Sequence, residues 1–184
     1  MDILILGGTG AMGIPLVDFL SKENQLYVTT RSCKENQNNI KYLQGNAKDT
    51  VFFNSLMNRD YDAIVDFMVY STEELGKRLP SLLDHTKQYF FFSSSRCYAD
   101  SSTLITENSP RLVDVCTDPE YLAIDEYGMA KGREENLLFN SGKTNWTIIR
   151  PYITYNTNRI QLGVYEKENW LKRALEGRTI VFPK

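Results

Sequence analysis

The sequence predicts an α/β fold in which a doubly wound parallel sheet carries helices on both faces. Short, unbroken apolar runs recur along the chain, as is typical of strands buried on both faces of a parallel sheet. Between them lie segments with apolar residues at helical spacing, and repeated strand–helix units build such sheets. Ligands of these sheets bind in the crevice at the carboxyl ends of the strands, so the residues after each apolar run are the functional candidates.

The predicted strands are runs of apolar, β-branched or aromatic residues that end at glycine, serine, proline or charged residues. In chain order we expect strands at 2–6, 25–30, 40–45, 61–69, 88–94, 146–149 and 179–182. The sixth strand is stopped by Arg150-Pro151, because proline cannot donate to the ladder of a central strand.

The predicted helices are segments with one apolar face. We expect them at 12–20, 49–58, 75–83, 121–140 and 168–175. Pro15 falls in the first turn of its helix, where a missing N–H does little harm, whereas Pro80 lies inside its segment. Asp49 is a candidate N-cap. Residues 99–120, rich in Ser, Thr, Asp and Pro, read as a loop.

Composition excludes several classes of protein. The 184 residues are 42% apolar and 24% charged, which rules out collagen, coiled coil and disorder. A net charge of −2 argues against a nucleic-acid partner. Three cysteines and one histidine provide neither a disulfide framework nor a His-rich zinc site, so no metal is expected. No apolar run reaches the ~18 residues of a membrane span, and the N-terminus is not a signal peptide, so we expect a cytoplasmic protein without a membrane partner.

A glycine-rich loop follows the first strand. Residues 7–13 read GGTGAMG and open the first helix, which is the context of a dinucleotide-binding turn. Without β-carbons, backbone N–H groups can approach a pyrophosphate beside the helix N-terminus. The alternative is a turn that only lets the helix pack on the strand. The second strand ends at Arg31 rather than at an acid that would bind a ribose 2′-hydroxyl, which favours NADP over NAD unless Arg31 is simply solvated.

Tyr127 and Lys131 form a candidate catalytic pair. They lie four residues apart on a predicted helix and therefore share one face, although this spacing is also a common coincidence. A phenol is a poor acid–base group at neutral pH, and a nearby ammonium stabilises its ionised form. Serines 93–95 end the fifth strand, where a hydroxyl can orient a substrate oxygen or simply cap the strand. Cys97 and His85 have no partners in sequence, so we expect structural roles for them.

Four motifs together resemble the short-chain dehydrogenase/reductase superfamily, and more narrowly its extended branch, the NAD-dependent epimerases and dehydratases of nucleotide sugars. They are the GGTGAMG loop, SSSRCY at 93–98, YGMAK at 127–131 and RPY at 150–152, and the resemblance covers essentially the whole chain. It implies a Rossmann-type fold, a nicotinamide cofactor (NAD or NADP) and a nucleotide-sugar substrate. It also implies a homodimer that pairs through helices, including the one that carries Tyr127.

The resemblance implies roles for residues at matching positions. Besides Arg31, the residues expected at the cofactor are Gly7, Gly10, Ala11, Met12, Gly13, Asn46, Phe67, Met68, Tyr127, Lys131, Pro151 and Ile153. The catalytic group would be Tyr127 and Lys131 with Ser94, which lies four residues before Tyr98. The expected substrate contacts are Ser95, the alternative to Ser94, together with Glu107 and Tyr155. Asn46 stands where the family often has an acid, and Tyr155 is not followed by the family's Gly-Pro, so the sugar stays open.

The resulting hypothesis is hydride chemistry at a sugar carbon, with Tyr127 as acid–base group and Ser94 holding the oxygen. Epimerase, dehydratase and reductase outcomes stay open. The rival hypotheses are a non-catalytic dinucleotide-binding sensor or RNA-associated protein of the same fold, and an inactive truncated copy. Extended members place much of their sugar-binding surface after the sixth strand. We therefore expect a cofactor domain over 1–157 and only the start of a truncated substrate lobe over 158–184, with that C-terminal lobe largely absent.

Overall fold

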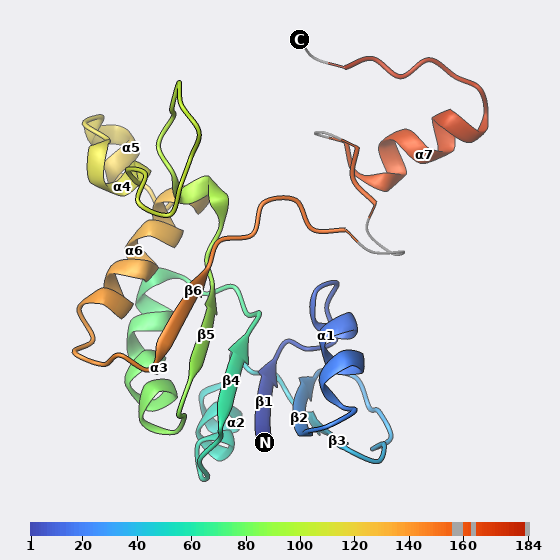
Figure 1. Cartoon of the computed structure of the whole chain (residues 1–184), viewed down its shortest axis with the longest axis vertical. Helices are drawn as coiled ribbons and strands as arrows, with labels where there is room; N and C mark the ends of the chain where they lie inside the picture. Colours follow the sequence, from blue (N-terminus) through green and yellow to red (C-terminus); the bar gives the residue numbers. More distant parts are fainter. Residues whose placement is uncertain (156–159, 163–164, 183–184) are drawn as a thin grey trace. The chain divides into compact units, whose positions relative to one another are not determined.

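A computed structural model describes residues 1–155, 160–162 and 165–182. The chain divides into two compact units, Met1–Tyr152 and Ile153–Lys184. Within its described residues, the first unit holds a six-stranded parallel sheet with the strand order β3-β2-β1-β4-β5-β6 (Figure 1). The strands are β1 (Asp2–Leu6), β2 (Gln25–Thr30), β3 (Ile40–Gln44), β4 (Ala63–Asp66), β5 (Tyr89–Phe92) and β6 (Trp146–Ile149). The predicted Rossmann-type sheet is confirmed.

The strand order creates a switch point between β1 and β4. The chain builds outward from β1 to β3 and then returns to β4 on the other side of β1, where Ile5 stands opposite Val65. The connections that leave these two strands therefore run in opposite directions and open a crevice at the carboxyl edge of the sheet. The glycine-rich loop follows β1 directly and lies at this crevice.

Helices cover both faces of the sheet. One face packs against α1 (Gly13–Leu20), whose Val17 is buried beside Ile5 and Val28. The other face carries α2 (Thr50–Leu56), α3 (Thr72–Asp84) and α6 (Tyr127–Phe139). Its core includes the side chains Phe53, Leu56, Leu75, Leu79, Leu82 and Leu138 from these helices and Leu4, Leu6, Ile64, Tyr89 and Phe91 from the strands. Burial of these apolar side chains is the main force that fixes the sheet between its helices.

Helix caps explain where the predicted bounds were wrong. The predicted helix over 121–140 is two helices, α5 (Pro119–Ala123) and α6, because Asp118 and Glu126 each cap a separate N-terminus with their carboxylates. The helix α3 begins earlier than predicted because Ser71 and Glu74 form a capping box. Pro80 lies within α3, which continues through it. Asp49 caps α2, as predicted.

The region expected to be a loop over 99–120 contains short helical elements. The helix α4 (Leu112–Val115) packs on α6, where a β-carbon on Gly132 would lie 2.7 Å from Val113 Cγ1. A 3₁₀ turn, η1 (Ser95–Cys97), follows β5. Both elements pack on the first half of α6, η1 at Gly128 and α4 at Gly132, and most residues of its first two turns are buried.

The second unit contains the helix α7 (Lys167–Leu175) within its described residues, close to the predicted helix. The indole of Trp170 donates to the carbonyl of Ile160, and the rings of Tyr165 and Phe182 pack edge to face at 5.7 Å. The predicted strand over 179–182 is wrong, because these residues are irregular and pair with no strand in the described part of the chain.

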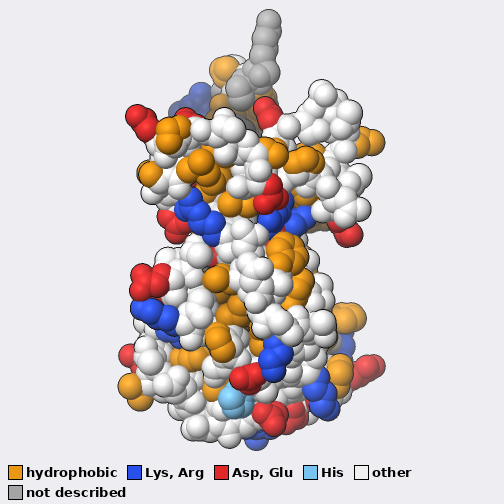
Figure 2. Space-filling model, turned by 90° about the vertical axis from the view of Figure 1, so that its left-hand side faces the viewer, with side chains coloured by type: hydrophobic (Ala, Val, Ile, Leu, Met, Phe, Trp, Pro, Cys, Tyr) orange, Lys and Arg blue, Asp and Glu red, His pale blue; other side chains and the backbone are white. Residues whose placement is uncertain are grey.

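Charge of both signs is mixed on the face that carries α3 and α6, and the single histidine, His85, lies among acidic and basic side chains (Figure 2). Its ring Nδ1 contacts the carbonyl of Ser81 at 2.9 Å at the end of α3, a local capping role. None of the described helices combines the length and the apolar character that crossing a membrane requires. The described residues also bring together no group of His, Cys, Asp and Glu that could hold a metal ion.

Candidate active site

The glycine-rich loop turns sharply between β1 and α1. Gly7 adopts a φ of +72°, a left-handed conformation that favours glycine, and its N–H donates to the hydroxyl of Thr29 at 2.9 Å. The N–H of Gly10 then donates to the carbonyl of Gly7 at 3.1 Å and closes the turn. The N-terminus of α1 has neither a side-chain cap on Met12 nor an acidic residue in its first turn, so its partial positive charge is not neutralised there.

The glycines of the loop at 7, 8, 10 and 13 differ in what surrounds the position of a β-carbon. A β-carbon on Gly8 would lie 2.7 Å from Val28 Cγ1, and one on Gly13 would lie 2.5 Å from the carbonyl oxygen of Gly8. Packing of the chain on itself explains both. A β-carbon on Gly10 would meet only the Gly7 carbonyl at 3.4 Å, so packing does not explain Gly10. Open space beside Gly10, next to an uncapped helix N-terminus, fits the approach of a pyrophosphate.

This difference predicts opposite results for two alanine substitutions. We expect Gly13→Ala to lower the free energy of unfolding by about 1–3 kcal/mol, because its β-carbon collides with backbone atoms. We expect Gly10→Ala to leave stability unchanged but to weaken NAD binding by about tenfold or more, because the new methyl occupies the space open to the cofactor. Chemical denaturation and calorimetric titration with NAD measure the two effects. Unchanged NAD affinity in Gly10→Ala would contradict the assignment of the loop.

The residues after β2 and β3 are Arg31 and Asn46, and both are exposed. Among the described residues no carboxylate pairs with Arg31, so its guanidinium is available to a ligand. The side-chain oxygen of Asn46 accepts a hydrogen bond from the N–H of Lys48 at 3.0 Å, so its amide stabilises a local turn. Gly45 is fixed by packing, since a β-carbon there would lie 2.5 Å from the ring of Phe52.

After β4 the chain passes beside the glycine-rich loop. The N–H of Phe67 donates to the carbonyl of Leu6, and its ring packs on Phe92 at 4.4 Å. A β-carbon on Gly7 would lie 3.2 Å from the sulfur of Met68, so Met68 directly adjoins the loop. The structure thus brings together Gly7, Phe67 and Met68, three of the residues predicted to contact the cofactor.

Asp66, the last residue of β4, was missed by the sequence analysis. Its side chain is 1% exposed; one carboxylate oxygen accepts the N–H of Met68, and the other accepts the hydroxyl of Tyr89 at 2.9 Å. Burial raises the pKa of Asp66 to about 6, although these hydrogen bonds and the charge of Lys131 oppose the rise. An acid that directly follows the apolar residues AIV inside the run YDAIVDFMV was the available signal.

The raised pKa of Asp66 predicts a pH-dependent stability. Between its ordinary value near 4 and about 6, the folded chain binds a proton that the unfolded chain has released. Stability from this group is therefore lost as pH rises through that window. Asn cannot ionise, so the stability of Asp66→Asn relative to wild type should increase between about pH 4 and about pH 6 and then level off. Melting temperatures across that range check this, and a difference that does not change with pH would contradict it.

The predicted catalytic pair lies at the start of α6. Tyr127 is the first residue of the helix, and its side chain is 41% exposed. Lys131, one turn later, is buried, and its ammonium donates to Glu134 Oε2 at 2.8 Å and lies 4.8 Å from the centre of the Phe91 ring. The other oxygen of Glu134 is buried without a hydrogen-bond partner among the described residues. Burial raises the pKa of Glu134, although the charge of Lys131 opposes this.

The three serines at 93–95 make different contacts. The hydroxyl of Ser93 donates to Glu135 Oε1 at 2.6 Å, so it is engaged inside the protein. The hydroxyl oxygen of Ser94 accepts the N–H of Arg96 and caps η1, while the N–H of Ser95 donates to the carbonyl of Pro151. A β-carbon on Gly128 would lie 2.5 Å from the carbonyl of Arg96, so η1 packs directly on the start of α6. Ser94 and Tyr127 are therefore on adjoining elements.

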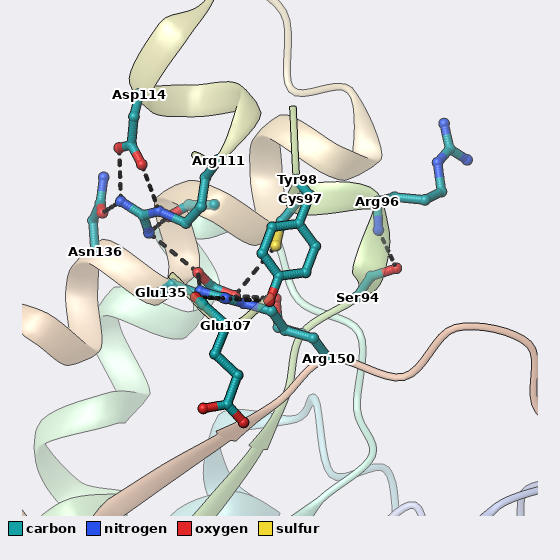
Figure 3. A network of polar contacts seen from close by, with 12 residues as sticks. Ser94, Arg96, Cys97, Tyr98, Glu107, Arg111, Asp114, Glu135, Asn136 and Arg150 are labelled. Atoms are coloured by element: carbon teal, nitrogen blue, oxygen red, sulfur yellow. Dashed lines mark hydrogen bonds and ion pairs between the residues drawn. The ribbon is translucent and has the colours of Figure 1, made fainter. Parts of the chain in front are cut away.

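A buried network centred on Glu135 joins these elements (Figure 3). Arg150, which follows β6, donates to both carboxylate oxygens of Glu135 at 2.8 Å, and Arg111 donates to Oε2 at 3.1 Å. Burial would raise the pKa of Glu135, but these hydrogen bonds and charges hold it below its usual value. Arg150 also donates to the hydroxyl of Tyr98 at 2.7 Å. The network therefore ties the end of β6 and the loop after η1 to α6.

Two further predictions fall on this network. Cys97 is buried, as expected, and burial followed by the charge of Glu135 raises the pKa of its thiol to about 11, which disfavours the nucleophilic thiolate. Glu107 contributes only its backbone carbonyl, which accepts from Arg150 at 3.1 Å, and its carboxylate points away from the network (Figure 3). Ile153 and Tyr155 belong to the second unit and stay predictions.

Comparisons with known proteins support the fold. No protein-family model and no curated protein matches the sequence. A UDP-N-acetylglucosamine 4-epimerase from Methanobrevibacter ruminantium, solved with UDP-N-acetylmuramic acid, matches 97% of this chain and 64% of its own, with a TM-score of 0.73 and 15% identity. The chain has the fold of the NAD-dependent epimerases. The enzyme WbmH from Bordetella bronchiseptica with NAD+ matches 96% of this chain and 63% of its own, with a TM-score of 0.71 and 14% identity.

A third solved structure, the UDP-glucuronic acid 4-epimerase from Bacillus cereus with NAD, matches similar shares of both chains. It covers 97% of this chain and 64% of its own, with a TM-score of 0.69 and 15% identity. The chain thus spans under two thirds of the length of these three solved proteins. A short-chain dehydrogenase/reductase protein from Agrobacterium tumefaciens with bound NAD has a TM-score of 0.60 and 18% identity over 82% of this chain and 48% of its own.

Proposed function

We propose that this chain carries the cofactor site and the catalytic residues of an NAD(P)-dependent oxidoreductase of the epimerase/dehydratase type that acts on a nucleotide sugar. One arrangement carries the proposal. Ser94, which caps η1, and Tyr127, the first residue of α6, both come after β5, which ends at the same sheet edge as the glycine-rich loop. Met68 adjoins Gly7, and the ammonium of Lys131 lies over the ring of Phe91, whose strand neighbour is Asp66, so these elements are contiguous.

A bound nicotinamide would supply the acceptor and donor of a hydride at a sugar carbon. In the proposed mechanism Tyr127 acts as a phenolate, whose oxygen takes the proton of the sugar hydroxyl to give the phenol and later returns it. The hydroxyl of Ser94 donates a hydrogen bond to the same sugar oxygen and orients it. Lys131 supplies positive charge beneath this site. Partial exposure of Tyr127 is consistent with contact to a substrate.

The cofactor proposal covers both dinucleotides. Neighbouring structures contain NAD, whereas the exposed Arg31 at the end of β2 can pair the 2′-phosphate of NADP. The Methanobrevibacter protein is a 4-epimerase of a uridine-diphosphate sugar solved with another such sugar, and the Bacillus protein is a UDP-glucuronic acid 4-epimerase. We propose uridine-diphosphate sugars as the substrate class of this chain.

One observation favours the rival function, a dinucleotide-binding protein without catalysis. The ammonium of Lys131 is committed to a buried ion pair with Glu134 at 2.8 Å, with both side chains 3% exposed or less. An amine held in this way does not reach a ribose unless the pair opens. In that case cofactor binding would rest on the glycine-rich loop, and proton transfer at Tyr127 would lack its cation.

A thermal-shift screen tests the proposal. A ligand that binds only the folded chain raises its melting temperature by mass action. We expect NAD or NADP to raise it, and a uridine-diphosphate sugar to raise it further when the dinucleotide is present. A shift with dinucleotide but with no sugar would favour the non-catalytic function. No shift with either dinucleotide would contradict the proposed function outright.

A further inference from the structure

Arg96 is a cation beside the candidate catalytic tyrosine. It is the middle residue of η1, and its guanidinium carbon lies 5.6 Å from the centre of the Tyr127 ring. Its side chain is 66% exposed and points away from the Glu135 network (Figure 3). The sequence analysis assigned no role to this residue.

The position of Arg96 is fixed by its surroundings. Its N–H donates to the hydroxyl oxygen of Ser94 at 3.2 Å, and its carbonyl packs against Gly128. At the other end of the side chain, Nη2 donates to Glu126 Oε1 at 2.6 Å. The guanidinium is therefore held at both ends next to Ser94 and Tyr127, which limits the entropy that a ligand would have to remove.

Glu126 does not use up the hydrogen-bonding capacity of Arg96. The second oxygen of Glu126 accepts the hydroxyl of Tyr121 at 2.9 Å and the N–H of Gly128 at 2.7 Å, so much of its charge is directed at the N-terminus of α6. Within the part of the chain that the structure describes, Nε and Nη1 of Arg96 have no acceptor. Each of these N–H groups can donate a charge-assisted hydrogen bond to an oxygen of a carboxylate or phosphate.

We propose that Arg96 binds a carboxylate on the sugar of the substrate, so that the site prefers acidic nucleotide sugars over neutral ones. This inference rests on the proposed function and names its substrate class. The phosphates of the nucleotide carrier offer similar oxygens. We favour the carboxylate because Arg96 adjoins Ser94 and Tyr127, the groups proposed to hold the reacting hydroxyl of the sugar itself.

Calorimetric titrations of the whole chain, saturated with NAD, test the inference with UDP-glucuronate and UDP-glucose. Wild type should bind the acid at least about tenfold more tightly than the neutral sugar, because a charge-assisted hydrogen bond from Arg96 is lost with UDP-glucose. Arg96→Leu should abolish this ratio and leave UDP-glucose and NAD affinity unchanged, and Arg96→Lys should restore part of it. Lys87→Leu is the matched control, since Lys87 is an exposed cation paired with Asp62 at the opposite edge of the sheet.

The other possible titration results separate failure of the inference from failure of the proposed function. Equal wild-type affinity for both sugars overturns the inference. An equal loss of affinity for both sugars in Arg96→Leu also overturns the inference, because Arg96 would then contact the phosphates that both sugars share. If NAD binds but neither sugar does, the proposed function fails and the inference fails with it. The melting temperature and NAD affinity of Arg96→Leu show that the variant is folded.

Discussion

Replacing Tyr127 by Phe should lower kcat on a nucleotide sugar by about 10²–10⁴-fold, because the phenol oxygen is the proposed proton acceptor. The change removes one oxygen atom from a side chain that is 41% exposed at the first residue of α6. Fold and NAD affinity should therefore stay at wild-type levels. Product formation under saturating sugar and NAD, followed by chromatography, measures the effect.

Tyr61→Phe provides the matched control for this substitution. Tyr61 is a buried phenol that precedes β4, and its hydroxyl donates to the carbonyl of Leu56 at 2.9 Å. Removing that hydrogen bond should cost about 1 kcal/mol of stability and leave kcat unchanged. Near-wild-type turnover in Tyr127→Phe would remove Tyr127 from the mechanism, and an equal loss in both variants would indicate a general effect on the fold.

Glu135→Gln should lower the free energy of unfolding by about 3–5 kcal/mol, because it removes a buried charge that pairs with two partly buried arginines, one of which keeps Asp114 as a second partner. Arg150 and Arg111 both donate to this carboxylate, and Ser93 donates to it at 2.6 Å. Urea denaturation of both proteins measures the difference. Activity should fall as well, since the same network joins β6, the loop after η1 and α6.

Glu73→Gln tests whether burial is the cause of that loss. Glu73 pairs with Lys77 at 2.6 Å, but both side chains are more than two-thirds exposed, so solvent screens the pair and it should contribute little to stability. If Glu135→Gln costs no more than Glu73→Gln, the buried network does not stabilise the fold as argued.

Local patterns in the sequence were enough to predict the sheet and the position of the glycine-rich loop. Apolar runs such as DILIL are long enough to identify buried strands, and their alternation with helical segments restricts the topology. The end of the chain at 179–182 shows the limit of this reasoning. The β-branched and aromatic residues TIVF have strand character, but no neighbouring strand pairs with them in the described residues.

Charged residues whose partners are distant in sequence were not predictable in the same way. Glu135 meets Arg111 and Arg150 only because α4, α6 and β6 come together in the fold. Glu134 and Asp66 are buried acids because of the way α6 packs beside β4 and β5, and that packing cannot be inferred from the local sequence. For the glycine-rich loop, the structure separated two explanations that the sequence left open, because packing accounts for Gly8 and Gly13 but not for Gly10.

The central claim is that the nicotinamide site and Tyr127 act on one substrate. The direct measurement is the absorbance of reduced nicotinamide after excess protein is mixed with NAD and a uridine-diphosphate sugar that has been shown to bind. We expect this absorbance to appear with wild type and to be absent with Tyr127→Phe. If dinucleotide and sugar both bind to wild type and no reduced nicotinamide forms, the chain is a binding protein and the catalytic account is wrong.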